Sequence, residues 1–524
     1  MPAPTALQPT RTHPFVHRNI PWFLKSRAEA FDDRVFLAWE PFAGEPATYT
    51  YTELADNTQK VAKGLYHLGV RQGDYVILHM NNCPEFIFTW FALSELGAVA
   101  VTTNTRSSMD EMHYFIEHCD AKCAITQPAF CDLITEAASD LTWIVSTETD
   151  SGEPADMPNN IISFATLYQS DASLPEIEID ALDPNSVQYT SGTTSRPKGV
   201  VWTHANALFG AKTMAQVPEL KTSDVTHVIM PLYHTNALIY SMMATMYCGG
   251  KIVLQPRFSA SRYWSVIEKH QINWGSIVPF VMHALRSQPV PESHSIEFWG
   301  LGAAEAPTAK RVFGIRTTGW YGMTETVGAV LMTENHHENL IGSIGVAAAG
   351  YEVKVVNDKN EEVAVGEDGV IKVRGIPGIS LFYEYLNNPE ATAESFDAEG
   401  WFDTGDIVTP LEDGSFAYVQ RIKDMLKVGA ENVAAAEIER VVAMAGNVRE
   451  AAVVGKPDKM LDEVPVVFVI ARKEDPDLPD RILETCRDQL ADFKVPREVF
   501  VVDSLPRVTL EKIDKKTLRA QLKS

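Results

Sequence analysis

The sequence has no long apolar run. Nowhere in its 524 residues do apolar side chains continue for the ~20 positions that a membrane-spanning helix needs. The opening stretch, MPAPTALQPTRTHP, also lacks the basic segment followed by an apolar core that marks an export signal. We therefore expect a cytoplasmic protein without a membrane as a partner.

Cysteine is scarce, with six residues spread thinly over the whole chain. A small fold held together by disulfides needs a much higher density of cysteines. Cys119 and Cys123 lie close together, but they lack the second Cys or His pair that a zinc site would need. We expect all six to be reduced thiols without a metal.

Positive charge is also in short supply. The 45 Lys and Arg residues are outnumbered by 69 Asp and Glu residues, which gives a formal net charge of −24 at pH 7. Such a surface repels phosphate backbones and argues against nucleic acid as a partner. The rest of the composition, 45% hydrophobic and 22% charged, is typical of globular proteins, and this length needs more than one hydrophobic core.

Much of the N-terminal part alternates between apolar strands and helices. Residues 75–104 are predicted to form strand, helix and strand, with Pro84 in the first helical turn and Gly97 at the C-terminal cap. The pattern recurs over 226–279. Because these strands are apolar without alternation, they are expected in parallel sheets that helices cover on both faces.

The pattern of apolar and polar residues changes from about Tyr351. Shorter, alternating strands with acidic, glycine-containing turns predict a small β-barrel-like subdomain over about 345–420. A helix at 434–445, apolar strands and a basic tail follow. We therefore predict an α/β protein with a large N-terminal domain of βα-layered sheets over 1–422 and a small α+β domain over 423–524.

The most specific motif lies at 189–199 and reads Tyr-Thr-Ser-Gly-Thr-Thr-Ser-Arg-Pro-Lys-Gly. A glycine among hydroxyl side chains lets backbone N–H groups and hydroxyls surround phosphate oxygens, and Lys198 can supply a positive charge. It is not a Walker A loop, because Pro197 and Gly199 stand where that motif needs Gly and then Ser or Thr. The segment predicts a phosphate-binding loop of another kind.

This loop resembles the signature of the acyl-adenylate-forming enzymes, which include acyl-CoA synthetases, nonribosomal peptide adenylation domains and firefly luciferase. Within that family, the Ser195-Arg196 variant and the GIPG stretch at 375–378 are most similar to bacterial crotonobetaine/carnitine-CoA ligases. Four further regions match family motifs in the right order, so that the resemblance spans nearly the whole chain. They are Tyr321-Gly-Met-Thr-Glu325, Trp401-Phe-Asp-Thr-Gly-Asp406, Arg421-Ile-Lys-Asp424 with Gly429-Ala-Glu-Asn432, and Pro506-Arg-Val-Thr-Leu-Glu-Lys512.

The resemblance implies a reaction in two halves. A carboxylate attacks the α-phosphate of ATP to give an acyl-adenylate and pyrophosphate, and the thiol of coenzyme A then forms the acyl-CoA and releases AMP. Magnesium would bridge the phosphates, with Glu325 as its ligand and Thr190 as a weaker one. The residues implied to bind ATP or AMP are Thr190, Ser191, Gly192, Thr193, Thr194, Lys198, Gly302, Ala303, Ala304, Tyr321, Gly322, Met323, Thr324, Asp406, Arg421 and Lys512.

The implied roles agree with the chemistry of the side chains. Tyr321 can stack on adenine, while Asp406 can accept both ribose hydroxyls and Arg421 can donate to the ribose. Thr324 offers a hydroxyl to the α-phosphate, which places it with Glu325 among the implied catalytic residues.

Lys512 is the residue expected to carry the first half-reaction, because a mobile ammonium can bridge the substrate carboxylate and the α-phosphate oxygens where negative charge develops. The resemblance also implies that the C-terminal domain is mobile and turns about a hinge at Lys423. That rotation would remove Lys512 and bring Gly429 and Ala430 beside the path of coenzyme A. Ala430 and Glu511 both stand where the family has glycine.

The acyl group is expected near the segment that follows Pro231. His234 matches a family position beside the substrate carboxylate and is included among the catalytic residues, with a structural core histidine as the alternative. The helix after it carries Met242, Met243 and Met246, which are expected to fill the core. The residues predicted to line the acyl pocket are His234, Asn236, Ala237 and Trp320.

Two alternatives stay open on the residues alone. The enzyme could pass its acyl group to a carrier protein or partner enzyme instead of coenzyme A, an option raised by Ala430 and Glu511. It could also be a non-catalytic nucleotide-binding relative, although such a protein has no need of Lys512. A homodimer is the base-rate expectation for its assembly, and the identity of the acid is left open.

Overall fold

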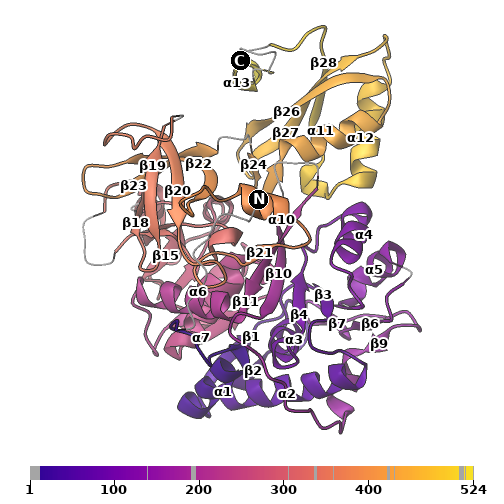
Figure 1. The fold of residues 1–524 in the computed structure, drawn as a ribbon, viewed down its shortest axis with the longest axis vertical. Coiled ribbons are helices and arrows are strands. Elements are labelled where there is room, and N and C mark those ends of the chain that lie inside the picture. Colours follow the sequence, from indigo (N-terminus) through magenta and orange to yellow (C-terminus); the bar gives the residue numbers. More distant parts are fainter. Residues whose placement is uncertain are drawn as a thin grey trace.

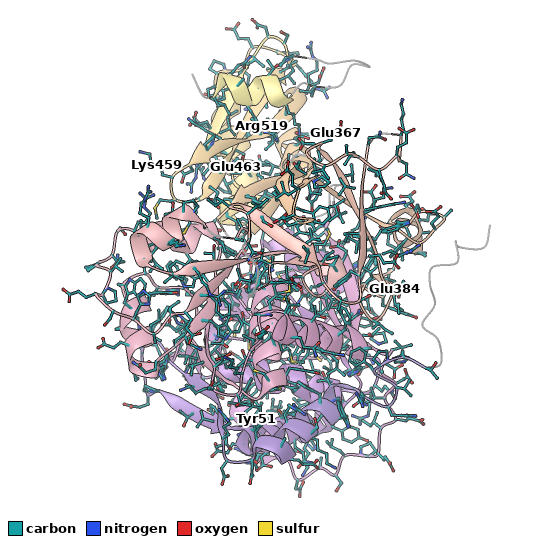
Figure 2. The ribbon with its side chains drawn as sticks, turned by 90° about the vertical axis from the view of Figure 1, so that its left-hand side faces the viewer. Tyr51, Glu367, Glu384, Lys459, Glu463 and Arg519 are labelled. Atoms are coloured by element: carbon teal, nitrogen blue, oxygen red, sulfur yellow. The ribbon has the colours of Figure 1, made fainter. Side chains whose placement is uncertain are left out.

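The computed structural model describes residues 12–138, 140–190, 196–304, 306–334, 339–357, 359–421, 425–429, 431–506, 513 and 515–522. A large N-terminal domain carries a smaller C-terminal lobe at one end (Figure 1). In Figure 2 that lobe bears Lys459, Glu463 and Arg519, while Tyr51 lies at the opposite end of the molecule. The predicted α/β class, with a large sheet domain and a small second domain, is confirmed.

The larger sheet of the N-terminal domain has a parallel half and an antiparallel half. Strands β1 and β12 to β16 pair in parallel, and the prediction over 226–279 covers β12, β13 and β14 among them. Within the described residues the sheet has 13 strands, in the order β19 (Glu352–Val356), β20 (Gly369–Arg374), β22 (Phe402–Pro410), β23 (Phe416–Arg421), β18 (Ser343–Ala347), β17 (Leu331–Met332), β16 (Arg316–Tyr321), β15 (Phe298–Leu301), β14 (Trp274–Ser276), β12 (Val225–Val228), β13 (Lys251–Leu254), β1 (Val35–Trp39) and β2 (Ala47–Thr50).

The second sheet contains the predicted strand-helix-strand unit. Strands β3 and β4 pair in parallel around α3 (Pro84–Glu95), and Gly97 takes a φ of 63° just after the helix. Helix α3 is apolar all round and is buried along most of its length. The described strands run in the order β21 (Glu384–Tyr385), β11 (Lys198–Thr203), β10 (Pro184–Thr190), β4 (Val99–Thr102), β3 (Tyr75–His79), β5 (Cys123–Thr126), β6 (Trp143–Ser146) and β9 (Ile162–Ser163).

The β-rich part after residue 345 corresponds to the subdomain predicted over about 345–420. Its strands are antiparallel and alternate between buried and half-buried residues, as predicted. However, β18 pairs with both β17 and β23, so this part continues the larger sheet. The short alternating strands were predictable from the sequence. That they join the parallel half was not, because it depends on the pairing of β17 with β16 and of β18 with β17 and β23.

The predicted helix at 237–248 begins as a π-helix, η3 (Asn236–Met243), and continues as α7 (Ala244–Cys248). Met242, Met243 and Met246 are fully buried, which confirms the prediction that they fill the core. π-Helical turns are rare and are frequent at functional sites. Asn236 and Tyr240 of this π-helix face a cavity that is described below.

The C-terminal domain is a five-stranded sheet with helices on both faces. Alternate residues of its central hairpin point to opposite sides: Val453 and Val467 pack in the cluster that contains α11 and α12, and Val454 and Val466 pack in the cluster that contains α13. The elements are β24 (Met425–Val428), β25 (Glu431–Ala434), α11 (Ala435–Met444), β26 (Val448–Asp458), β27 (Asp462–Ala471), α12 (Leu478–Gln489), η6 (Asp492–Lys494), β28 (Glu498–Val501) and α13 (Lys515–Gln521).

The remaining elements cover the two large sheets. No helix in the described ranges combines the length and the apolar character needed to cross a membrane. These elements are α1 (Ile20–Phe31), α2 (Tyr51–His67), α4 (Met109–His118), η1 (Pro128–Phe130), α5 (Cys131–Ala137), β7 (Thr149–Asp150), β8 (Glu153–Pro154), η2 (Phe164–Gln169), α6 (His204–Gln216), α8 (Tyr263–His270), α9 (Pro279–Leu285), η4 (Ala309–Phe313), η5 (Thr324–Thr326) and α10 (Pro389–Glu394).

Candidate active site

A cavity of about 1000 Å³ lies where the parallel strands of both sheets end. Its walls include Thr102, Thr190, Leu301 and Tyr321, the last residues of β4, β10, β15 and β16, and Ile277 directly after β14. Ligands of open α/β sheets bind outside the carboxyl ends of the strands. The C-terminal domain closes the cavity on its other side with Lys427, Gly429, Glu431, Asp462, Phe493 and Lys494.

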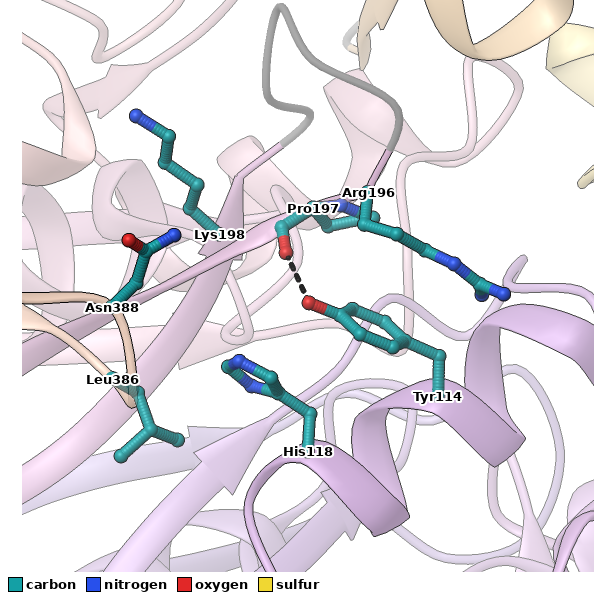
Figure 3. Close-up of a pocket in the computed structure, with 7 residues that line it drawn as sticks. All are labelled: Tyr114, His118, Arg196, Pro197, Lys198, Leu386 and Asn388. Carbon is teal, nitrogen blue, oxygen red and sulfur yellow. Dashed lines mark hydrogen bonds between the residues drawn. The ribbon is translucent and has the colours of Figure 1, made fainter. Parts of the chain in front are cut away.

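The phosphate-binding motif joins two antiparallel strands at the edge of this cavity. β10 and β11 pair so that Thr190 lies opposite Lys198, and the intervening residues 191–195 lie outside the described residues. The Tyr114 hydroxyl donates to the Pro197 carbonyl at 2.9 Å and anchors the start of the returning strand (Figure 3). In Figure 3 the side chains of Arg196 and Lys198 extend in opposite directions, and Arg196 pairs with Asp110 at 3.2 Å.

Glu325 lies in the short η5 helix after β16 and is 6% exposed. Its Oε1 accepts a hydrogen bond of 2.9 Å from the hydroxyl of Tyr385 on β21. The same tyrosine ring lies 4.2 Å from the Lys198 Nζ in a cation–π arrangement. Tyr385 therefore links the carboxylate of one motif to the ammonium of the other, and it orients both toward the same space.

Asp406 lies on β22 and is 2% exposed. One carboxylate oxygen accepts from the Tyr321 hydroxyl at 2.8 Å, and the other accepts from the Tyr418 hydroxyl at 3.4 Å. The strand register places Asp406 opposite Arg421 on β23. Three residues predicted to contact the nucleoside, Tyr321, Asp406 and Arg421, are therefore neighbours.

His234 meets the C-terminal domain. Its Nε2 lies 3.1 Å from Oε2 and 3.2 Å from Oε1 of Glu431, so the pair crosses the boundary between the two domains. Burial disfavours the imidazolium, but the Glu431 carboxylate outweighs burial and raises the pKa of His234. Burial likewise opposes the carboxylate, and His234 nevertheless lowers the pKa of Glu431. Each group thus favours the charged form of the other.

Trp320 and Tyr240 form the inner end of the cavity. Their rings make an edge-to-face contact with centroids 5.9 Å apart. The Trp320 indole occupies the space above Gly300, where any side chain would clash with it. The Tyr240 hydroxyl similarly faces Gly322 so closely that a methyl group there would collide with it. Two glycines thus fix how deep the cavity can be.

Most of the predicted residues line this one cavity. They are Thr190, Lys198, His234, Asn236, Gly302, Ala303, Trp320, Tyr321, Gly322, Met323, Thr324, Glu325, Asp406 and Gly429.

Of the predicted residues whose side chains the structure describes, two do not line it, and of Arg421 only the backbone is described. Ala237 follows Asn236 on the π-helix and is fully buried in the core, so its assignment to the acyl pocket is wrong. Ala304 is also fully buried, because its N–H and carbonyl bond to Ser343 and Gly342. The predictions on Ser191, Gly192, Thr193, Thr194, Lys423, Ala430, Glu511 and Lys512 lie outside the described residues.

Several residues at the site were not predicted, and three of them contact predicted ones. Tyr385 lies on β21, which carries no family motif, and Tyr418 lies on β23, three residues before Arg421; only their hydroxyl contacts reveal them. Glu431 belongs to the Gly-Ala-Glu-Asn motif, so its position near the site could have been anticipated from the sequence. Its pairing with His234 depends on how the domains dock.

Comparisons with known proteins agree with this arrangement. The AMP-binding enzyme family matches residues 24–386, and the C-terminal domain of AMP-binding enzymes matches residues 437–512. The chain belongs to the AMP-binding enzyme family. It is 33% identical over 507 residues to crotonobetaine/carnitine-CoA ligase of Escherichia coli O7:K1, a match that covers 94% of this chain and 97% of that relative.

Two structures of o-succinylbenzoate CoA synthetase from Bacillus subtilis are also similar, each 28% identical over 96% of this chain and 98% of theirs. A double mutant bound to the product analogue OSB-NCoA gives a TM-score of 0.81, and the complex with AMP gives 0.67. The predicted family and reaction class are confirmed. This AMP-binding enzyme is an adenylate-forming acyl-CoA synthetase, an acid–thiol ligase whose substrates are ATP, coenzyme A and a small carboxylic acid.

Proposed function

We propose that this enzyme activates an uncharged, largely apolar carboxylic acid, such as an aromatic or medium-chain acid. The carrying observation is that Ile277, Val278, Leu301, Tyr240 and Trp320 are among the residues that line the cavity. Among the described residues of the lining, the acidic side chains lie at the nucleotide side or on the domain boundary. A fixed cation such as a trimethylammonium group would find aromatic faces there but no carboxylate.

A panel of acids tests the substrate class. Each acid is incubated with ATP, magnesium and coenzyme A while pyrophosphate, AMP and acyl-CoA are followed separately. We expect benzoate-like and medium-chain acids to exceed crotonobetaine at least tenfold in kcat/KM. A preference for crotonobetaine would contradict the proposal and would assign the aromatic faces to an ammonium group. Pyrophosphate without acyl-CoA would instead support delivery to a carrier protein.

The depth of the pocket gives a mutational prediction. Trp320→Ala should open the space above Gly300, lower kcat/KM for the best natural acid by about tenfold, and improve acids that are longer by two or three carbons, because each buried methylene is worth about 1–3 kcal/mol of discrimination. Trp320→Phe is the control and should keep most of the original preference. An equal loss for all chain lengths would mean that Trp320 only supports the fold.

The nucleotide would lie between Tyr321, Asp406 and Lys198, with magnesium bound by Glu325 and, more weakly, by Thr190. A hard carboxylate oxygen is the ligand that magnesium prefers, and Glu325 keeps its Oε2 for such a contact while Oε1 accepts from Tyr385. Magnesium would supply charge neutralisation on the phosphates. Thr324 would donate its hydroxyl to the α-phosphate.

Tyr385→Phe tests this arrangement. The variant removes one hydroxyl and leaves the ring under Lys198, so only the orientation of Glu325 is lost. A hydrogen bond to a charged group is worth about 1.5–3 kcal/mol, so we expect a fall of roughly tenfold or more in adenylation, with a higher magnesium concentration needed for half-maximal rate. The same change at Tyr383, which is exposed on the same strand region, is the matched control. A rate loss without any change in magnesium dependence would contradict the assignment.

We also propose that the domains of 1–422 and 423–524 alternate about a hinge at Lys423, and that the arrangement described above serves the second half-reaction. Glu431 and Gly429 face the cavity from the C-terminal side, as the path of a thiol would require. The higher TM-score with the OSB-NCoA complex than with the AMP complex of the same synthetase supports this reading.

A further inference from the structure

A cluster of buried charges joins the two domains away from the nucleotide. Lys494 of η6 forms ion pairs with Glu111 of α4, in the N-terminal domain, and with Glu437 of α11, in its own domain. The distance from Lys494 Nζ to Glu437 Oε1 is 2.9 Å. The side chains of Lys494, Glu111 and Glu437 are only 8%, 6% and 5% exposed. Removing one member of a buried ion pair is far more costly than removing a surface pair.

The charges in this cluster do not balance unless one carboxyl is protonated. Burial raises the pKa of Glu437 to about 7, with Lys494 opposing this rise and Glu111 adding to it. Burial also opposes ionisation of Glu111, but Lys494 outweighs it and lowers the pKa of that carboxyl. Glu437 Oε2 is buried without a hydrogen-bond partner in the described part of the chain. Of the two carboxyls that contact Lys494, Glu437 is therefore the one that takes up a proton more readily.

Weaker contacts surround the cluster and come from the same short segment. Arg106 Nε donates to Asp492 at 2.8 Å, Ser108 Oγ donates to the Gln489 carbonyl at 2.9 Å, and Asp110 lies 3.8 Å from Arg440. The Arg106 and Asp492 side chains are 42% and 77% exposed, so that pair contributes little. Within this segment, docking therefore depends mainly on the buried contact between Lys494 and Glu111.

The cluster is continuous with the cavity. Glu111 and Lys494 line it together with Gly429, Glu431 and Phe493. When the C-terminal domain turns away, Lys494 and Glu111 separate, and both regain water. We propose that Lys494 is a positioning residue whose ion pair with Glu111 holds the C-terminal domain in the thioester-forming arrangement. This inference rests on the proposed alternation of the two domains.

Hydrogen–deuterium exchange of the full-length protein tests the proposal without any substrate. Lys494→Met should make amides of 104–111 and 429–437 exchange at least about tenfold faster, while β26 and β27 keep their protection. Lys456→Met is the matched control, because Lys456 pairs with Glu498 at 2.6 Å inside the C-terminal domain. Unchanged exchange in Lys494→Met would overturn the proposal, and so would an equal increase throughout the domain, which would mark Lys494 as a residue that only supports the fold.

Substitutions of Glu111 and Glu437 test the two contacts of Lys494 separately. Glu111→Gln lies in the other domain, so it cannot act by unfolding the C-terminal domain, and it should reproduce the faster exchange of 429–437. Glu437→Gln mimics the protonated form and should keep the domains docked. If Glu111→Gln left 429–437 protected, the ion pair would not be what holds the domain.

The pKa of Glu437 gives the direction in which domain docking depends on pH. Burial raises the pKa of Glu437 to about 7, and the Glu111 carboxylate of the other domain adds to the rise. Because separation of the domains would remove Glu111 and admit water, docking should take up a proton and weaken as the pH rises through about 7. Glu437→Gln should remove this part of the pH dependence from the exchange rates of 429–437. The pKa of His234, which pairs with Glu431, is also raised. Loss of the His234 proton as the pH rises should therefore weaken docking as well. If the exchange rates of 429–437 in Glu437→Gln kept the complete pH dependence of the wild type, the role proposed for the cluster would be wrong.

The half-reactions give the functional readout, with the best acid from the panel as substrate. Lys494→Met should slow thioester formation from a preformed acyl-adenylate by at least about tenfold and leave pyrophosphate exchange within about twofold of wild type. Failure of the proposed function would show as absent acyl-CoA in the wild type. Failure of this inference would show as equal effects on both half-reactions in the variant.

Discussion

Lys512→Ala should reduce adenylate formation by roughly 10²–10³-fold, the loss expected when one donor to developing oxyanion charge is removed. The attack of coenzyme A on a preformed acyl-adenylate should stay within a few-fold of wild type. The reason is that one ammonium is needed only while the carboxylate attacks the α-phosphate. Pyrophosphate exchange measures the first step, and acyl-CoA release from added acyl-adenylate measures the second.

A lysine close to Lys512 in the sequence gives the control for this separation. Ile513 packs against the cluster of Val454, Val466 and Leu518, on the face of the C-terminal sheet opposite the cluster of α11 and α12. In the arrangement described, Gly429 and Glu431 of the C-terminal domain line the cavity. Lys515→Ala is the control, since Lys515 pairs with Glu439 at 2.7 Å within its own domain. Equal losses in the two half-reactions of Lys512→Ala would refute the role given to this lysine.

Contiguous motifs made the nucleotide side of the cavity predictable. Tyr321 to Glu325 end one strand, and Asp406 and Arg421 occupy facing positions on two neighbouring strands. Each motif carries its chemistry in a few consecutive residues, so its function can be recognised before its partners are known. The parallel sheets were predictable for a related reason, because a strand buried on both faces is apolar at every position.

The parts that escaped prediction depend on contacts between distant residues or on unusual helical geometry. Tyr385 reaches Glu325 across 60 positions, and Glu431 reaches His234 across 197. No local pattern encodes such pairs. Ala237 was assigned to the pocket as the end of the segment 231–237, but Asn236 and Tyr240 line the cavity from one face of the helix, while Ala237 lies in the core.

Asp406→Asn should weaken AMP binding by about 10²-fold, measured by titration calorimetry without any acid present. A carboxylate that accepts both ribose hydroxyls makes two charge-assisted hydrogen bonds, each worth about 1.5–3 kcal/mol, and the amide replaces one acceptor oxygen with a donor. The variant keeps the shape of the side chain and its bond from Tyr321. Tyr418→Phe is the control, because the contact it removes is long, at 3.4 Å, and leaves the carboxylate in place.

Nucleotides that lack one hydroxyl show whether Asp406 acts on the ribose itself. The wild-type enzyme should bind 2′-deoxy-AMP and 3′-deoxy-AMP more weakly than AMP, since each analogue leaves a buried carboxylate oxygen without its ligand partner. In Asp406→Asn the penalty for at least one analogue should nearly vanish, because the bond that the analogue lacks is already lost. If both penalties persisted in full, the carboxylate would act only by holding Tyr321 against the adenine, and Tyr321→Phe should then reproduce the whole loss.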